Sequence, residues 1–446
     1  MSGKLVTWGL LAMTCAFLVT GAVGPLWAQE SGTTGGPVVP KVDTGDTAWV
    51  LASATLVLGM TAPGLALFYG GLVRSKNALG TIMQSFIILC VVSVLWILVG
   101  YSLAFGPDHK GLIGGLDWIG LSGVGSAPHP SYGPTIPHAA FMVFQLMFAA
   151  ITPALITGAF AERMRFPAVL LFTVLWSLLV YCPVAHWIWG GGWLTKLGAL
   201  DFAGGAVVHT TSGLSALVCA WVIGARHGYG TDYMAPHSLP LTLLGTGLLW
   251  FGWFGFNAGS ALGANSIAVM AMIATHTAAS AGALSWMTVE WLHRGSPTVL
   301  GIASGAVAGL ATVTPAAGYV GPFSACVIGL AAGALSYTAI ISKGKLGYDD
   351  SLDVVGIHGV GGVLGILATG VLASTAINPA GADGLLFGKP LTLAIQALTA
   401  LVTVAYSVAG TFVILKIVDR VVGLRVTREE ESLGLDLSQH NERAYS

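Results

Sequence analysis

The sequence is poor in charged residues. Aspartate, glutamate, lysine and arginine make up 8% of its 446 residues, whereas an ordinary globular protein has about 25%. The formal net charge is −1, so the chain lacks the basic surplus with which proteins bind nucleic acid. Hydrophobic residues instead make up 55% of the chain, and the mean hydropathy is +0.81. This composition excludes an ordinary soluble domain and indicates a membrane protein with several spans.

Cysteine is also scarce. The five cysteines lie far apart in apolar runs, and no two of them form a C-x-x-C pair. This spacing argues against a disulfide framework and against a zinc site. The H-E-x-x-H signature of zinc proteases is missing too. We therefore expect no metal, no cofactor and no enzymatic activity. The cysteines are Cys15, Cys90, Cys182, Cys219 and Cys326.

One short pattern suggests an enzymatic alternative. Gly120, Ser122 and Gly123 fit the G-x-S-G pattern of rhomboid-like intramembrane proteases. The pattern lies in the loop 106–137, after Asp117 and before a proline-rich run. Because glycine, serine and proline cluster in turns, a turn is the favoured interpretation.

The first 45 residues differ from the rest of the chain. Lys4 precedes an apolar run, and Leu26-Trp27-Ala28 resembles a small-residue cleavage site. These features predict a signal peptide over residues 1–28. The alternative is a first helix that is not cleaved. Residues 29–45 are polar and rich in glycine, proline and threonine, and we expect them to form an extracytoplasmic lead-in.

Apolar runs of roughly 20 residues, the length that a helix needs to cross a bilayer, fill most of the remaining chain. We predict an all-α polytopic membrane protein with eleven transmembrane helices. The transmembrane domain is expected over residues 46–418 and a cytoplasmic C-terminal tail over 419–446. The runs cover residues 47–72, 79–105, 138–160, 165–186, 203–225, 238–259, 264–291, 298–315, 319–341, 354–373 and 390–418.

Lysine and arginine predict the orientation. Arg74, Arg163 and Arg226 each follow an odd-numbered run, as do the arginines of the tail. Loops on the cytoplasmic side are rich in these residues. We therefore expect a multi-pass protein of the cell (inner) membrane, with its mature N-terminus outside and its C-terminus in the cytoplasm.

The eleven runs divide into two sets of five and one extra C-terminal helix. The fifth run opens with Asp201 and carries His209, whereas the tenth opens with Asp353 and carries His358. Related segments of opposite direction are typical of an inverted repeat, whose site lies at mid-membrane between the halves. The carboxylate precedes the histidine by different distances in the two runs, so the repeat is a hypothesis.

The two histidines are the strongest functional candidates. Ionisable groups inside a membrane are costly and usually face a polar pathway. Two imidazoles that share one hydrogen offer both a donor and an acceptor while staying neutral. The alternatives are a helix-to-helix hydrogen bond and a metal site, but two histidines without a third ligand make a poor zinc site. We assign structural roles to His186 and His276.

Aromatic residues and Asp201 complete the candidate site. Most of the 14 tryptophans fit an interfacial belt. Where aromatic faces and a hydroxyl converge, however, they attract a small cation by about 2 kcal/mol when it is desolvated. Asp201 is expected to cap its helix, because aspartate accepts N–H bonds at the positive helix end. A direct role as a cation ligand is the alternative.

Several long motifs resemble one known family. They are AITPALITGAFAERMRF, HWIWGGGW, GALDFAGGAVVHTTSG, GWFGFNAGS, DDSLDVVGIHGVGG and the tail GLRVTREEESLGLDLSQHNERAYS. In this order they resemble the ammonium transporters of the Amt/Mep/Rh superfamily, especially the bacterial Amt branch, over essentially the whole mature chain. The resemblance implies eleven helices in two inverted five-helix halves, a homotrimer and one pore per subunit.

The resemblance also implies roles for individual residues. An outer recruitment site falls on Phe148, Trp189 and Ser260, and a stacked phenyl gate falls on Phe148 and Phe256. The pore residues are then Trp253 and the twin histidines His209 and His358, with Asp201 as a structural residue near the site. The bacterial branch further implies inhibition by a PII-type regulatory protein, which would meet the loop 226–237 and the tail.

The chemistry of ammonium agrees with these residues. Ammonium and potassium are similar in size and charge, but only ammonium donates hydrogen bonds and can lose a proton. A narrow apolar pore imposes the full cost of desolvation on a permanent ion, whereas ammonia avoids it. We expect ammonium, with methylammonium as an analogue, to be deprotonated and conducted as ammonia, with or without the proton. A pore for another small solute, or a sensor built on the same fold, is the alternative.

Overall fold

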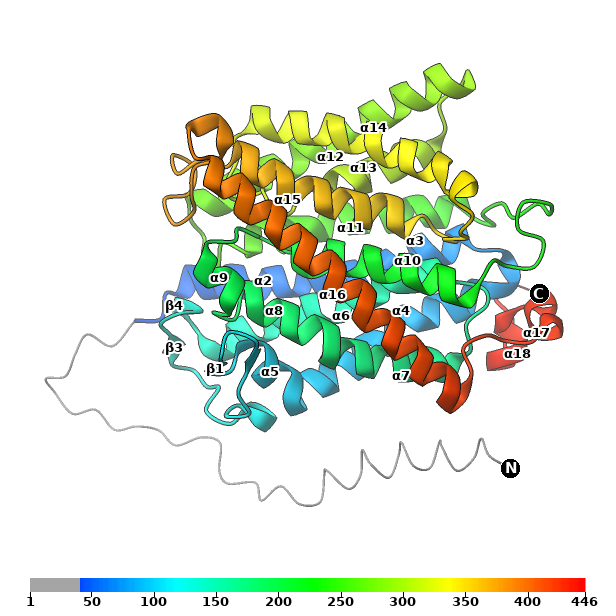
Figure 1. Cartoon of the computed structure of the whole chain (residues 1–446), viewed down its shortest axis with the longest axis horizontal. Coiled ribbons are helices and arrows are strands. Elements are labelled where there is room, and N and C mark those ends of the chain that lie inside the picture. Colours follow the sequence, from blue (N-terminus) through cyan, green and yellow to red (C-terminus); the bar gives the residue numbers. More distant parts are fainter. Residues whose placement is uncertain (1–40, 446) are drawn as a thin grey trace, which may run out of the picture. The chain divides into compact units, whose positions relative to one another are not determined.

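The structure, a computed structural model, describes residues 41–445 (Figure 1). The predicted signal peptide and most of the lead-in lie outside these residues. Long helices dominate the described part, which confirms the all-α fold class. Ten helical stretches are long and apolar enough to cross a membrane, and Val299–Val313 is a shorter apolar helix. These coincide with the eleven predicted runs, although a count of eleven spans remains a prediction because the short helix does not reach the spanning length.

The first half of the chain holds five of these stretches. Three of them contain a turn of π-helix between α-helical parts, and the fifth begins with one. They are α2 (Thr44–Gly59), η1 (Met60–Leu65) and α3 (Ala66–Leu72); α4 (Ala78–Leu95), η3 (Trp96–Gly100) and α5 (Tyr101–Phe105); α6 (His138–Phe160); α7 (Phe166–Trp176), η5 (Ser177–Tyr181), α8 (Cys182–Ile188) and α9 (Trp193–Leu197); and η6 (Gly205–Thr210) with α10 (Thr211–Ile223).

The second half also holds five helical stretches, the third of them short, and is followed by an extra helix. Its last stretch again begins with a π-helical turn that carries a histidine. The elements are α11 (Leu239–Gly259), α12 (Ser266–Arg294), α13 (Val299–Val313), α14 (Pro322–Leu346), and η7 (Val355–Gly359) with α15 (Val360–Leu372); then α16 (Pro390–Val422) and the short tail helices α17 (Arg428–Leu433) and α18 (Leu435–His440).

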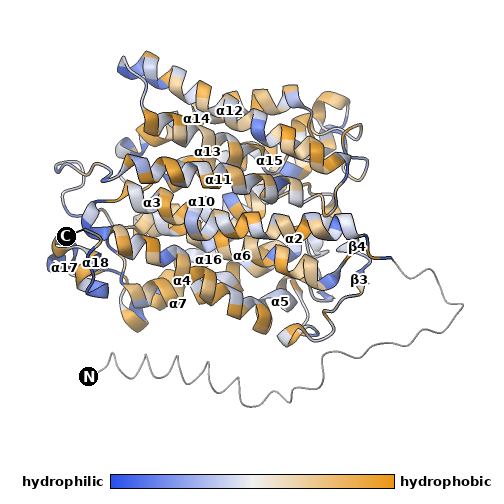
Figure 2. Ribbon diagram, turned by 180° about the vertical axis from the view of Figure 1, so that it is seen from behind, coloured by the Kyte–Doolittle hydropathy of each residue, from blue (hydrophilic) through white to orange (hydrophobic). Residues whose placement is uncertain are grey.

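The two ends of the helices differ in what covers them. One side carries a loop with two small hairpins, in which β1 (Asp108–His109) pairs with β2 (Ile113–Gly114) and β3 (Pro128–His129) pairs with β4 (Gly133–Pro137). We call it the loop side. The other side, the tail side, carries α17 and α18 (Figure 1). Figure 2 shows hydrophobic residues along the long helices and hydrophilic residues mainly at their ends and in the tail.

Three predicted run ends need correction. The fourth stretch continues to Leu197 rather than ending at residue 186, α14 ends at Leu346 rather than at 341, and α16 ends at Val422 rather than at 418. The predicted start of the tail at 419 therefore lies inside α16. Asp419 and Arg420 are exposed, so their charges can reach polar surroundings without ending the helix. Gly423, the residue after the helix, terminates it with φ 72°, a conformation that favours glycine.

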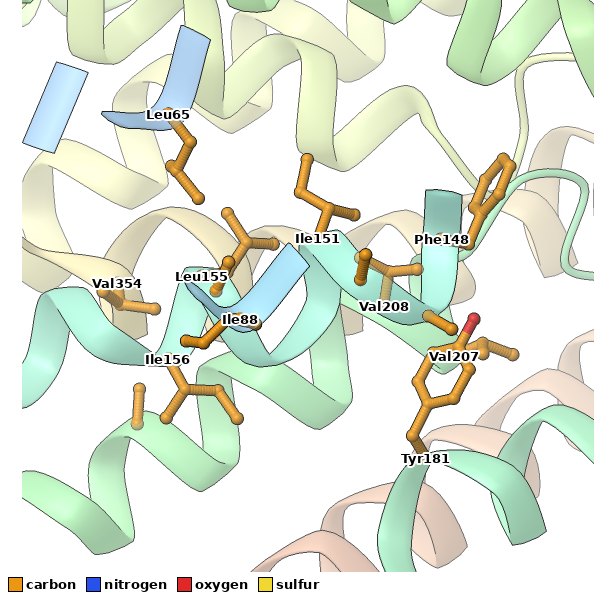
Figure 3. Packing of buried hydrophobic residues seen from close by; sticks show 14 of the residues in the cluster. Leu65, Ile88, Phe148, Ile151, Leu155, Ile156, Tyr181, Val207, Val208 and Val354 are labelled. Atoms are coloured by element: carbon orange, nitrogen blue, oxygen red, sulfur yellow. The ribbon is translucent and has the colours of Figure 1, made fainter. Parts of the chain in front are cut away.

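The two halves are in direct backbone contact at their histidine-bearing segments. A Cβ atom on Gly213 would lie 2.1 Å from the backbone nitrogen of Gly359. Only glycine permits such an approach. Residues of both halves also share one apolar core, in which Val354 lies among Ile88, Leu155 and Ile156 (Figure 3). The halves are therefore interlocked rather than separate domains.

Candidate functional site

A pocket of about 360 Å³ opens on the loop side. Its lining includes Phe148 from α6, Trp189 at the end of α8 and Ser260 at the end of α11. These are the three residues expected to form the recruitment site. The Ser260 hydroxyl donates to the backbone oxygen of Phe256 at 2.8 Å, so its oxygen lone pairs remain free to accept a hydrogen bond.

The Trp189 ring is held in place by its own N–H group. Nε1 donates to the backbone oxygen of Asp201 at 2.8 Å. The ring meets Phe148 edge to face, with centroids 5.7 Å apart and an angle of 85°. The pocket therefore has one aromatic wall whose orientation is fixed by a hydrogen bond and by packing.

Two phenyl rings lie at the inner end of the pocket. The centroids of Phe148 and Phe256 are 4.3 Å apart, and both side chains are buried. The two rings contact each other, as expected of a stacked gate, but they are tilted by 40° rather than parallel, and their role as a gate stays a prediction. Each ring is instead tilted by its other aromatic neighbours, which are Trp189 for Phe148 and Trp253 for Phe256.

Trp253 lies beyond this pair of rings. Its ring centroid is 5.4 Å from that of His209, and the two planes differ by 26°. Nε1 of Trp253 donates to the hydroxyl of Thr314 at 3.0 Å. Because the indole N–H has a partner, the tryptophan presents only apolar ring atoms to the histidine.

His209 and His358 meet at the centre of the protein. Their Nδ1 atoms are 3.1 Å apart, and the ring planes differ by 20°. Since a hydrogen bond needs one donor and one acceptor, one Nδ1 carries a hydrogen and the other does not. Both side chains are buried, and Nε2 of His209 has no hydrogen-bond partner within residues 41–445.

The backbone explains how the two rings come together. His209 lies in η6 and His358 in η7, and both turns are π-helical. A π-helical turn rotates side chains away from the α-helical positions and is common at functional sites. The close approach of Gly213 and Gly359 then brings the two turns close enough for the rings to touch.

Asp201 caps η6 with both of its carboxylate oxygens. Oδ1 accepts from the N–H groups of Gly204 at 2.8 Å and Gly205 at 2.6 Å. Oδ2 accepts from those of Ala206 at 2.8 Å and Val207 at 3.1 Å. Burial raises the pKa of Asp201 above its ordinary range, while these four bonds oppose the rise. The geometry therefore favours the capping role over the role of a cation ligand.

The counterpart of Asp201 in the second half is Asp350, not Asp353 as predicted. Asp350 precedes His358 by eight residues, as Asp201 precedes His209, and its Oδ2 accepts from the N–H of Val355 at 2.7 Å. Asp353 instead pairs with Lys343. The equal spacing was present in the sequence and would have identified Asp350.

The pocket also contains polar residues that the sequence did not single out. Gln145 and Asn378 are buried in its lining, and the half-buried Tyr319 lies in the lining too. The side-chain oxygen of Gln145 has no hydrogen-bond partner in the part of the chain that the structure describes. A buried amide in the apolar helix α6, one turn before Phe148, was the available signal.

The remaining histidines named from the sequence lie away from this pair. His186 is fully buried and forms hydrogen bonds with residues on the loop side. Its Nε2 is 2.9 Å from Oδ1 of Asp108, and its Nδ1 is 3.0 Å from the backbone oxygen of Ala104. His276 is exposed on α12, beside Trp250. The G-x-S-G pattern forms a turn, in which Gly120 and Gly123 have φ of 61° and 75°.

Comparisons with known proteins agree with this architecture. Residues 48–445 match the Ammonium Transporter Family. The chain is 54% identical to an ammonium transporter of Bacillus subtilis, over 90% of this chain and 98% of that protein. It is 50% identical to ammonium transporter Amt1 of Archaeoglobus fulgidus, over 90% and 99%. Among solved structures, Candida albicans Mep2 has a TM-score of 0.83 at 37% identity, with 91% of each chain covered.

Proposed function

The chain belongs to the ammonium transporter family and carries ammonium across a membrane, and we propose that it captures ammonium at the aromatic pocket, deprotonates it and conducts ammonia past His209 and His358. The observation that carries this mechanism is the buried imidazole pair, with 3.1 Å between the two Nδ1 atoms. When the neutral pair accepts a proton, one ring becomes an imidazolium, and the pair is neutral again once a proton leaves from either ring.

Capture begins with the aromatic wall. The face of Trp189 attracts a desolvated cation by about 2 kcal/mol. The lone pairs of Ser260 accept one of the hydrogen bonds that ammonium donates, which potassium cannot do. The unpartnered oxygen of Gln145 supplies a further acceptor in the same pocket. Capture therefore favours a cation that carries hydrogen-bond donors.

Rejection of potassium follows from the segment beneath the pocket. Phe148 and Phe256 close its inner end, and Trp253 adds another apolar surface. A permanent ion would lose its hydration there without gaining compensating partners. Ammonium avoids this cost by giving its proton to the imidazole pair, where Nε2 of His209 has no other partner within residues 41–445. Ammonia can then accept from or donate to the imidazoles.

We further propose that the subunits form a homotrimer with one pore each. His276 supports this assembly because it is exposed near the middle of α12, and a polar side chain within a membrane normally faces protein rather than lipid. The buried Nε1 of the neighbouring Trp250 also has no partner within the described chain. A second subunit against this face would cover both groups.

A PII-type protein is the proposed regulatory partner, with the C-terminus and the tail side in the cytoplasm. The loop 226–237 supports this interaction because it lies beside the tail. The backbone N–H of His227 donates to Oε1 of Glu431 at 2.8 Å, while Tyr233 in the same loop is 93% exposed. The start of the loop is therefore held by the tail, while Tyr233 further along the loop is accessible to a partner.

Currents in reconstituted vesicles test the mechanism. Ammonium and potassium gradients are imposed in turn on the wild type and on His209→Ala and His358→Ala, with His186→Ala as the control. We expect both pore variants to lose ammonium current at least tenfold or to admit potassium, while the control keeps its selectivity. Wild-type currents together with unchanged potassium exclusion in both pore variants would refute the proton-relay role. The ratio of charge to ammonia transported decides whether the proton accompanies it.

Methylammonium uptake separates transport from the alternatives. A pore for another solute would not take up this analogue in competition with ammonium. One structural relative, similar at 31% identity with a TM-score of 0.81, is named as a sensor Amt protein, which makes sensing the relevant second candidate. Uptake by the purified protein in vesicles, without any partner, is the result expected of a transporter.

A further inference from the structure

A second hollow lies on the outer surface of the helices, far from the pore pocket. It is a groove of about 620 Å³ between α10, α16 and the end of α14. Leu217, Val408 and Ala409 are part of its lining, and Trp221 and Phe412 lie on its open rim. Trp221 is 70% exposed. The groove is therefore apolar and open to the surroundings of the helices.

The groove lies at the tail-side edge of the membrane-spanning region. Trp221 is two residues from the end of α10, and Leu346, which also lines the groove, is the last residue of α14. In Figure 1 α16 crosses in front of α10 on the way to this side. Exposed tryptophan at such a level is typical of the boundary between hydrocarbon and headgroups.

Positive charge lies at the same end of the groove. Nζ of Lys416 is 5.4 Å from the centre of the Phe412 ring, and it is one helical turn closer to the tail side. Lys345 and Arg420 are exposed near this level. The one acidic neighbour on this part of α16, Asp419, accepts from the N–H of Leu424 at 3.2 Å. The rim thus has a net positive charge beside an apolar channel.

We propose that this groove is a phospholipid site that holds an acyl chain of a tail-side lipid and pairs its anionic headgroup with Lys416. An apolar hollow within the bilayer takes hydrocarbon, and a lysine at the headgroup level attracts anionic lipid by electrostatics. The polar groups that call for a second subunit, His276 and Trp250, lie elsewhere on α12 and α11. Among the residues that line the groove, only Tyr348 and the rim residue Trp221 have a polar side-chain group, and both lie at the tail-side end, near the level of the headgroups. The rest of the lining is apolar, so a lipid is the occupant that fits it.

Lipid binding by the purified protein tests the site directly. Native mass spectrometry measures the affinity for phosphatidylglycerol and for phosphatidylcholine with identical acyl chains. Three variants are compared with the wild type. Lys416→Gln removes the charge, Ala409→Phe fills the groove, and Lys389→Gln removes an exposed charge from the opposite end of α16 as the control.

We expect the wild type to hold one phosphatidylglycerol per chain more tightly than phosphatidylcholine. Lys416→Gln should reduce that preference by about fivefold, Ala409→Phe should weaken both lipids, and Lys389→Gln should change neither. Equal affinities for the two lipids, or retention unaffected by Ala409→Phe, would overturn the proposal. A loss of the oligomer in Ala409→Phe would overturn it as well, because the groove would then be a subunit contact. Pore conduction is not involved in this test, so its result is independent of the transport mechanism.

Discussion

Burial and hydrogen bonding have opposite effects on the pKa of Asp201, because burial raises it and the backbone N–H groups lower it. Each carboxylate oxygen of Asp201 accepts from two backbone N–H groups, so the negative charge is stabilised by the start of η6. The two oxygens therefore have few lone pairs left with which to bind a cation. Trp189 donates to the backbone oxygen of the same residue. A change at Asp201 therefore acts on the histidine turn and on the aromatic wall together.

Substitutions at Asp201 distinguish a cap from a cation ligand. Asp201→Asn keeps an acceptor and should retain part of the transport activity, because asparagine also caps helices well. Asp201→Ala removes both oxygens and should lower stability by at least about 1 kcal/mol, with transport falling in parallel. Transport and melting temperature are measured on the same preparations. Equal loss of transport in both variants with unchanged melting would assign Asp201 to the ion pathway.

Asp350 predicts a pH dependence of stability. Burial raises its pKa to about 6, with the charge of Asp353 acting in the same direction and Lys343 opposing. An unfolded aspartate titrates near 3.9, so the folded state binds the proton more tightly. The contribution of Asp350 is therefore most favourable below about pH 4 and is lost as the pH rises through 6.

The variant Asp350→Asn cannot titrate and serves as the reference. Its melting temperature minus that of the wild type should increase between pH 4 and pH 7, while Asp117→Asn, at an exposed loop position, gives the background. Melting curves in detergent at several pH values measure the difference. A constant difference across this range would contradict the assignment.

At the scale of elements, α16 does more than add one crossing. Its Gln396 is fully buried and bonds both halves of the repeat. Nε2 donates to the oxygen of Leu200 at 2.7 Å and to that of Ile366 at 3.3 Å, while Oε1 accepts from the N–H of Leu200 at 2.8 Å. Leu200 immediately precedes Asp201, so the extra helix fixes the start of the pocket wall.

Replacement of this glutamine should therefore alter substrate capture. In Gln396→Leu the N–H and C=O groups of Leu200 lose their partners, at a cost of about 1–3 kcal/mol. We expect a lower melting temperature and a higher half-saturation concentration for methylammonium. Thr399→Val, one turn further along α16, removes a hydroxyl that bonds only its own helix and should leave half-saturation unchanged. Equal half-saturation in all three proteins would mean that Gln396 does not position the pocket.

The sequence predicted the long helices because continuous apolar runs determine membrane crossing directly. Motif resemblance also named side chains that the fold brings together, including the histidine pair. It did not reveal the π-helical turns, since local backbone shape leaves no periodic signal. The tilt of Phe148 on Phe256 depends on neighbours from several helices. The prediction of Asp353 rests on its place at the start of the run, but Lys343, ten residues earlier, pairs with it, and Asp350 bonds the backbone of η7 instead.

At the scale of the whole molecule, two outer faces of the helices carry different kinds of side chain. The face of α11 and α12 carries His276 and Trp250 among apolar residues. The groove face of α10 and α16 carries aromatic residues and lysine. We expect the first face to meet protein and the second to meet lipid.

The assembly is tested by His276→Leu. If the histidine faces lipid, leucine is neutral or stabilising. If it hydrogen-bonds across a subunit contact, its loss weakens the trimer by about 1 kcal/mol. We expect the mutant trimer to dissociate at a lower temperature or detergent concentration, as measured by native mass spectrometry. Val269→Leu, an apolar change on the exposed face of the same helix, is the control. A His276→Leu trimer as robust as the wild type would place this face in lipid.

The contact of Gly213 with Gly359 has a mechanical consequence. Many secondary transporters expose their site alternately by rocking one half against the other, and such domain motions take microseconds to milliseconds. Here the halves touch backbone to backbone beside the histidines, where even a methyl group would lie 2.1 Å from a main-chain nitrogen. A rocking motion would have to pivot through this contact and separate the imidazoles at every cycle. We therefore expect the molecule to work as a fixed conduit, in which turnover is governed by movement of the substrate and its proton rather than by movement of the protein.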